Sequence, residues 1–173
     1  HTRFLYVSWA RMCIRDSTKS PSDYIPELKG SAFDRVTVQH VLDHATGLAF
    51  EENYVDPQSD FFLYYAPALN MGYLPGAADL QPGQSAIYGV YDFLSHFVKP
   101  DLQTPPGQRF DYNSANADVL GWLVSRLMEK PLNDVIRDAV WSKIGAEHDA
   151  YIAVDRAYIC LLYTSDAADD TPC

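Results

Sequence analysis

Apolar side chains recur at helical spacing in several stretches of the chain, and segments rich in polar residues, Pro and Gly separate these stretches. In the first stretch, residues 37–47, Thr37 can cap a helix that Gly47 can end. Apolar positions three and four residues apart predict its buried face, which consists of Val38, Val41, Leu42 and Ala45. The same spacing predicts a second helix over residues 85–98, with inward residues Ile87, Val90, Tyr91 and Leu94.

Two further helices are predicted later in the chain. Ser114 is a good N-cap for a helix whose inward face consists of Ala117, Leu120, Leu123, Val124 and Leu127. Pro131 can be the first residue of the next helix, which Gly145 ends. Strand signals are scarce, so this part of the chain is predicted to be mostly α-helical.

Residues 48–82 show no hydrophobic period, which predicts a long irregular segment. Its acidic residues are Glu51, Glu52, Asp56 and Asp60. They can bind calcium, but they lack the spacing and the Gly of an EF-hand loop, which favours a solvated loop. Its aromatic residues can line a substrate cleft or form a core beneath the segment, and both alternatives stay open: Phe61, Phe62, Tyr64, Tyr65 and Tyr73.

The 173-residue chain has the composition of a globular domain, with 47% hydrophobic and 21% charged residues. Its formal net charge of −10 argues against nucleic acid or an anionic membrane as a partner, because both repel an acidic surface. No apolar run is long enough to span a bilayer. The 3 cysteines lie near the chain ends, which predicts neither a disulfide framework nor a metal site. Cytoplasmic and periplasmic locations stay open, as does the oligomeric state.

The two ends of the chain differ in character from the rest. The segment "MCIRDS" (12–17) can be encoded by a DNA string whose reverse complement encodes "CLLYT" (160–164). No folding requirement produces that relation, whereas a DNA element inserted in opposite orientations does, and the string resembles a transposase adapter used in sequencing libraries. We therefore expect residues 1–17 and 160–173 to be translated adapter. Residues 18–159 are then expected to be the central part of one domain, with a gene product that continues on both sides.

The stretch "VTVQHVLDHATGLAF" (36–50) has the form "TVrhLLxHxSGl", and "PPGQRFDYNSANADVLGWLV" (105–124) has the form "PGxxFxYSNxgyxlLGxii". Together they resemble the serine β-lactamase and penicillin-binding-protein-like superfamily, in its class C and esterase branch. The segment "EENYVDPQSD" (51–60) is similar to a loop of the 6-aminohexanoate-oligomer hydrolase branch. The resemblance implies an α+β, β-lactamase-like fold, in which an antiparallel sheet is flanked by helices and a helical region lies beside it. Residues 18–159 would hold mainly that helical region.

The chemistry that this resemblance implies is hydrolysis of an ester or amide through an acyl-enzyme. In the family, the nucleophilic serine and its lysine form S-x-x-K, and a tyrosine carries the proton to the leaving group. The residues "YNS" make Tyr112 the catalytic candidate, and Ser114 a candidate contact to the substrate or the active site, although many relatives have Asn there. The implied partner is a small ester or amide, with neither a metal nor an organic cofactor. No S-x-x-K occurs in the chain, so we expect the chain as given to be inactive.

Other interpretations stay open. The same scaffold can serve a D,D-peptidase or β-lactamase, or a non-catalytic binding or sensor relative that has lost the nucleophile. By residue type alone, Tyr112 can be one more core tyrosine, and only its setting before Asn113 and Ser114 favours catalysis. His40 and His44 stand at i, i+4 and can chelate a metal. The absence of an intervening Glu and of a third ligand favours packing or capping for both histidines.

Overall fold

The computed structural model describes residues 17–71, 87–148, 151–155, 157 and 159. Helices and turns form nearly all of its ordered elements, and the residues described contain no β-strand. Leu48 and Leu102 make an isolated antiparallel bridge. The helical character expected for this part of the chain is therefore confirmed. The segments expected to be adapter lie outside the described residues, apart from Ser17.

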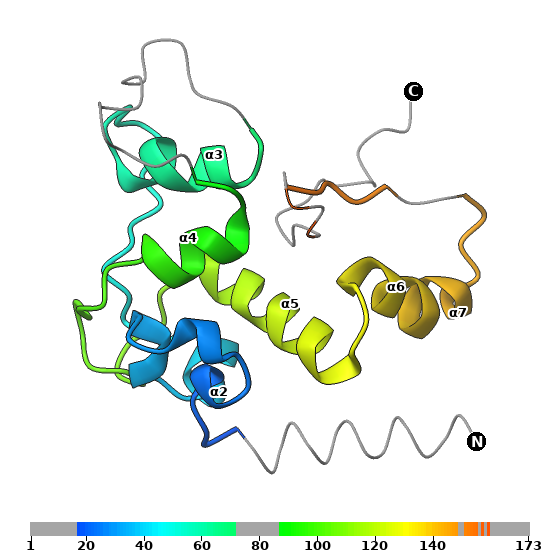
Figure 1. Ribbon diagram of the computed structural model, residues 1–173, viewed down its shortest axis with the longest axis horizontal. Coiled ribbons are helices and arrows are strands. Elements are labelled where there is room, and N and C mark those ends of the chain that lie inside the picture. Colours follow the sequence, from blue (N-terminus) through cyan, green and yellow to red (C-terminus); the bar gives the residue numbers. More distant parts are fainter. Residues whose placement is uncertain (1–16, 72–86, 149–150, 156, 158, 160–173) are drawn as a thin grey trace.

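The elements in chain order begin with three short 3₁₀ turns and continue with short helices around one long helix. They are η1 (Pro21–Asp23), η2 (Pro26–Leu28), η3 (Ala32–Arg35), α2 (Val38–Leu42), η4 (Phe61–Tyr65), α3 (Ala66–Ala68), α4 (Val90–His96), α5 (Ser114–Met128), α6 (Leu132–Ile136), η5 (Arg137–Trp141) and α7 (Ser142–Ile144). The long helix α5 crosses the middle of the molecule, with α2 and α4 packed beside its first half (Figure 1). The helices α6 and α7 lie beyond its C-terminal end (Figure 1).

The hydrophobic core lies where α5 meets α2 and α4. Val41 of α2, Phe93 of α4 and Val119 of α5 are fully buried there. Burying one apolar side chain of this size stabilises the fold by about 1.5–3 kcal/mol. Toward η4 the core is aromatic, because the ring of Phe50 packs edge-on against Tyr65 and Phe93 with centroids 5.4 and 5.1 Å away. These contacts place η4 and α4 against the loop that follows α2.

The N-terminus of α2 is capped as its sequence predicts. The hydroxyl of Thr37 accepts a hydrogen bond from the backbone N–H of His40 at 3.2 Å. The ring atom Nδ1 of His40 accepts one from the N–H of Thr37 at 3.2 Å. Two N–H groups that the first helical turn leaves unpaired are satisfied in this way. The capping interpretation is therefore confirmed for His40.

The C-terminus of α2 differs from the prediction, since the helix ends at Leu42 and Gly47 does not end it. The N–H of Ala45 donates to the carbonyl of His40 at 2.8 Å, and the N–H of His44 donates to Val41 at 3.2 Å. With His44 in the left-handed region at φ 48°, this is the Schellman arrangement. The early end leaves Leu42, which the spacing predicts to point inward, 46% exposed.

The helix α4 is shorter than the predicted 85–98 helix within the described residues, because it starts only after Gly89. Ile87 is buried as expected, but in the loop before α4. The ring of Tyr91 stacks on Trp122 of α5, with centroids 3.9 Å apart and ring planes 7° from parallel. This stack fixes α4 against α5.

The helix α5 confirms the third predicted helix but shifts its cap and its buried face. The N-cap is Asn113, so the assignment of that position to Ser114 is wrong by one residue. The buried face includes the polar residues Asn116 and Asp118, which a purely apolar pattern excludes. Of the five side chains expected inward, only Leu123 is buried, and the other four are partly exposed. The inward face is therefore rotated toward the two polar residues: Oδ1 of Asn116 accepts a hydrogen bond from Thr46, and Asp118 accepts one from Tyr65.

The last predicted helix and the segment predicted to be irregular each differ in part from the prediction. Pro131 caps α6 instead of starting it, and the stretch through α7 ends at Gly145 with φ 72°, as expected. The elements η4 and α3 form inside the segment that is predicted to be irregular. Their sequence from Phe61 to Ala68 is apolar on every side, so it shows no 3.6-residue period.

Candidate active site

Two loops far apart in the sequence run alongside each other at the start of α5. The N–H of Gly107 donates to the carbonyl of Ala45 at 2.7 Å, and the N–H of Asp111 donates to the carbonyl of His44 at 2.7 Å. These loops belong to the two stretches that carry the family resemblance, so their docking brings both motifs to one place.

A glycine allows this close approach. Gly47 has φ 70°, and a Cβ added there would lie 2.2 Å from the carbonyl oxygen of Thr104. No other residue fits both the backbone conformation and the space. The carbonyl of Gly47 also accepts a hydrogen bond from the N–H of Gln103 at 2.8 Å. Gly47 therefore serves the contact between the first motif and the residues directly before the second motif, not the end of a helix.

Asn113 fastens the start of α5 to both loops. Its Oδ1 accepts a hydrogen bond from the N–H of Ala115 at 3.0 Å, which caps the helix. Its Nδ2 donates to the carbonyl of Phe50 at 2.8 Å, and its backbone N–H donates to Nδ1 of His44 at 3.3 Å. The backbone on the C-terminal side of Tyr112 is thereby held in one position.

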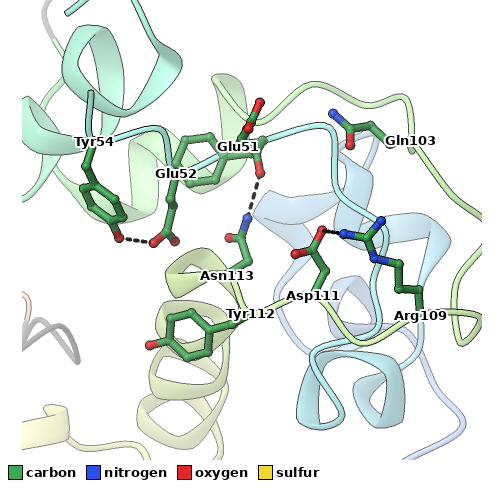
Figure 2. A pocket seen from close by; sticks show the side chains of 9 residues that line it. Glu51, Glu52, Tyr54, Gln103, Arg109, Asp111, Tyr112 and Asn113 are labelled. Atoms are coloured by element: carbon green, nitrogen blue, oxygen red, sulfur yellow. Dashed lines mark hydrogen bonds and ion pairs between the residues drawn. The ribbon is translucent and has the colours of Figure 1, made fainter. Parts of the chain in front are cut away.

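Tyr112, the predicted catalytic residue, lies immediately before this cap. Its side chain is 60% exposed, so it is not a core tyrosine. Its ring stacks on the imidazole of His44, with centroids 4.8 Å apart and planes 15° from parallel. The phenol points away from Arg109 and Asp111 (Figure 2). The positive end of the α5 dipole lies next to it, and the Glu52 carboxylate accepts hydrogen bonds there.

A pocket of about 390 Å³ opens beside Tyr112, and its walls come from residues 50–54 and 103–113 (Figure 2). It is lined by Phe50, Glu51, Glu52, Tyr54, Gln103, Arg109, Asp111, Tyr112 and Asn113. The carboxylates outnumber the single cation, Arg109, which itself lies 3.8 Å from Asp111. This volume is within the usual range for small-molecule sites, and its lining is polar and acidic.

Ser114, the second predicted site residue, is the first residue of α5 and is buried. Its hydroxyl donates to Oε2 of Glu52 at 3.2 Å, and its backbone N–H also bonds to the Glu52 carboxylate. The phenol of Tyr54 donates to Oε2 of the same carboxylate at 2.5 Å. In this structure the Ser114 side chain therefore contacts Glu52, and its contact to substrate stays a prediction.

The other groups weighed from the sequence have structural roles. Within the described part of the chain, no group of three or more His, Cys, Asp or Glu residues could hold a metal ion. Asp56 accepts a hydrogen bond from the N–H of Gln58 at 2.9 Å, and Asp60 pairs with Lys99 at 2.9 Å. Phe61 and Tyr65 are buried, and Phe62 and Tyr64 pack against the core, which favours the core interpretation for these four aromatics. Tyr73 lies outside the described residues.

Sequence reasoning missed His44, Asn113 and Glu52 as partners of the candidate site. His44 and Asn113 are 69 residues apart, and Glu52 and Ser114 are 62 apart. Local patterns carry no information about such contacts. The sequence does carry a signal for the role of Asn113 as the cap of α5, because Asn is among the most favourable N-cap residues.

A second buried polar contact lies behind the site. The phenol of Tyr65 donates to Oδ2 of Asp118 at 2.5 Å, and both residues are buried. Burial first, and then the negative charge of Asp118, raise the pKa of Tyr65 far above its usual range. Tyr65 is therefore a neutral hydrogen-bond donor at any physiological pH.

Comparison with known proteins places the chain in a family. A sequence model described as Beta-lactamase matches residues 14–157. A 6-aminohexanoate-dimer hydrolase of Paenarthrobacter ureafaciens is 33% identical over 141 residues, which cover 82% of this chain and 33% of the relative. A Beta-lactamase of Providencia stuartii is 24% identical over 143 residues, or 82% of this chain and 29% of the relative.

The fold leads to the same family. The solved structure of a putative 6-aminohexanoate-dimer hydrolase from Bacillus anthracis superimposes with a TM-score of 0.65 and 25% identity. The match covers 84% of this chain and 36% of that structure, so the chain spans about a third of the length of such relatives. None of the helices described is long and apolar enough to cross a membrane. The chain belongs to the beta-lactamase family and carries part of a β-lactamase-like fold.

Proposed function

We propose that this chain is part of a serine hydrolase that cleaves an ester or amide through an acyl-enzyme, with Tyr112 as the proton carrier. The observation that carries the proposal is the placement of Tyr112. Its phenol is exposed at the rim of a pocket, while its neighbours are fixed by both family motifs. An exposed polar aromatic group on a rigid support is what a proton-transfer residue requires.

The proposed reaction runs in two halves. A serine hydroxyl from an S-x-x-K segment adds to the substrate carbonyl carbon, and its proton passes to the lysine amine, from which Tyr112 relays it. The C–O or C–N bond then breaks as Tyr112 donates a proton to the departing oxygen or nitrogen. Water releases the acyl group by the same steps in reverse. The position of Tyr112 directly before the capped N-terminus of α5 supports this role, because the cap holds its backbone in place.

The proposed substrate is a small amide or ester. The relative with 33% identity is named a 6-aminohexanoate-dimer hydrolase, and the pocket volume of about 390 Å³ suits a molecule of modest size. The excess of carboxylates over Arg109 in the lining favours neutral or cationic substrates over anionic ones.

The test uses the gene product that contains residues 18–159 together with an S-x-x-K segment. We expect p-nitrophenyl acetate to be hydrolysed and intact-protein mass spectrometry to detect an acetyl group on the serine. Faster turnover of nitrocefin than of the ester would replace the esterase or amidase assignment by a β-lactamase. A protein that is folded but neither acylated nor active on either compound would be a binding or sensor relative, and the proposal would be wrong.

A further inference from the structure

We propose that His44 is a positioning residue that holds the Tyr112 ring in its reactive orientation, as a neutral imidazole protonated on Nε2. The part of this inference that concerns catalysis rests on the proposed function. The part that concerns the side chains of His44 and Tyr112 rests on their contacts alone. Three features of His44 lead to it: its backbone conformation, its hydrogen bond and its ring stack.

The backbone of His44 occupies a position that favours glycine. His44 follows the C-cap of α2 with φ 48°, in the left-handed region where a Cβ is unfavourable. Neither of the hydrogen bonds that close this helix end requires an imidazole, because both are made by backbone groups. Histidine is among the residues that tolerate this region, and here its side chain makes both a hydrogen bond and a ring stack.

The hydrogen bond of His44 selects one protonation form of its ring. Nδ1 lies 3.3 Å from the backbone nitrogen of Asn113, and that N–H points to it as a donor. Nδ1 must therefore carry a lone pair, which places the proton of the neutral ring on Nε2. An imidazolium or an Nδ1–H tautomer would place an N–H group of His44 against the N–H of Asn113, and neither group could accept a hydrogen bond. The bond also connects the imidazole directly to the residue that caps α5.

The ring stack restricts the orientation of the Tyr112 side chain. The two rings are 15° from parallel with centroids 4.8 Å apart, although the Tyr112 side chain is 60% exposed. Without a partner, an exposed tyrosine samples several rotamers, and its hydroxyl moves by ångströms between them. The imidazole covers one face of the phenol ring and leaves the hydroxyl free. A proton carrier must keep its oxygen within hydrogen-bond reach of the reacting groups, so this restriction favours proton transfer.

The direct test is NMR spectroscopy of the 173-residue chain. Long-range proton–nitrogen spectra of the histidine side chains are expected to show His44 with a protonated Nε2 and an unprotonated Nδ1. The ring protons of Tyr112 should be shifted upfield by the stacked imidazole, compared with those of the exposed Tyr88. An Nδ1–H tautomer for His44, or a Tyr112 ring without this shift, would overturn the inference. Neither readout requires enzymatic activity.

Two variants separate the hydrogen bond from the stack. His44→Asn tolerates a left-handed backbone and keeps an acceptor near the position of Nδ1, but it removes the ring. It should abolish the upfield shift of Tyr112. His44→Phe keeps a ring and removes the acceptor, so amide exchange at Asn113 should become roughly fivefold faster, as expected for one lost hydrogen bond. His96→Asn, at an exposed histidine of α4, is the matched control and should change neither signal.

The catalytic arm uses the gene product that carries S-x-x-K. We expect His44→Asn to lower kcat by roughly tenfold with KM nearly unchanged, because ring order affects the transition state more than binding. An unchanged kcat in this folded variant would contradict a positioning role. An inactive wild-type gene product, together with the expected NMR results, would contradict the proposed function and leave the His44–Tyr112 arrangement standing.

Discussion

Two pairs of buried polar side chains join α5 to distant parts of the chain. The hydroxyl of Thr46 donates to Oδ1 of Asn116 at 3.0 Å, and the phenol of Tyr65 donates to Asp118 at 2.5 Å. Buried polar groups destabilise a fold unless they are hydrogen-bonded. The Asp118 carboxylate is the more sensitive of the acceptors, because a charge depends more on its donors than a neutral amide does.

At this scale we predict that Tyr65→Phe lowers the free energy of unfolding by about 1.5–3 kcal/mol, the range for a hydrogen bond to a charged group. The ring and its aromatic contacts remain, so the loss measures the missing donor to Asp118. Urea denaturation monitored by circular dichroism checks the value. Tyr88→Phe, at a residue that is 67% exposed, is the control and should change stability by less than about 0.5 kcal/mol. Equal stability of Tyr65→Phe and the wild type would contradict this role.

At the scale of single elements, the C-terminal end of α5 contains a residue in an unfavourable backbone conformation. The helix α5 ends with Glu129 in the left-handed region at φ 52°. The N–H of Lys130 donates to the carbonyl of Ser125 at 3.2 Å, which is the hydrogen bond across six residues that defines a Schellman ending. A glutamate here bears the same backbone strain as His44, but the structure places no ring contact on it.

We therefore predict that Glu129→Gly stabilises the protein by about 0.5–1 kcal/mol, because glycine adopts this conformation without steric cost. Thermal unfolding at neutral pH measures the gain. Glu129→Ala removes the same carboxylate but keeps a Cβ, so it should bring no gain. A gain for Ala equal to that for Gly would assign the effect to charge and not to backbone conformation.

The elements also show what a sequence can predict. The existence of α5 followed from apolar spacing inside it, and the Thr37 cap of α2 followed from neighbouring residues. The end of α2 was not predicted, because a histidine and not a glycine takes the left-handed position, and the partners of its ring, Asn113 and Tyr112, are distant in the sequence. The same applies to the start of α5, where Asn113 bonds to Phe50. The candidate Tyr112 came from resemblance, while its partner His44 came from the three-dimensional structure.

At the scale of the whole molecule, the candidate site depends on docking of the two motif loops. We predict that Gly47→Ala costs at least about 2 kcal/mol of stability, because it adds a clash with Thr104 to left-handed strain. Gly30→Ala is the matched control, since Gly30 has φ 80° but nothing within 4 Å of an added Cβ. It should cost only about 1 kcal/mol. Chemical denaturation of both variants compares the two costs, and equal losses would contradict the docking role of Gly47.

The proposed mechanism also predicts the behaviour of the chain as given. The 173 residues contain no S-x-x-K, so this mechanism leaves Tyr112 without a nucleophile to assist. We expect no hydrolysis of p-nitrophenyl acetate above the buffer rate. Losing the nucleophilic serine costs a serine protease such as subtilisin about 10⁶-fold in kcat, so residual turnover should be undetectable. Turnover by this chain that Tyr112→Phe abolishes would contradict the serine mechanism.

The most direct measurement is kcat of the Tyr112→Phe variant in the gene product that carries S-x-x-K. The substitution keeps the ring that stacks on His44 and deletes only the hydroxyl, so folding should be nearly unaffected. We predict that kcat for p-nitrophenyl acetate falls by roughly 10²–10⁴, the usual contribution of a general acid–base group. Tyr88→Phe, at a similarly exposed tyrosine outside the pocket, should retain full activity. Equal kcat values for the wild type and a folded Tyr112→Phe would remove Tyr112 from the mechanism.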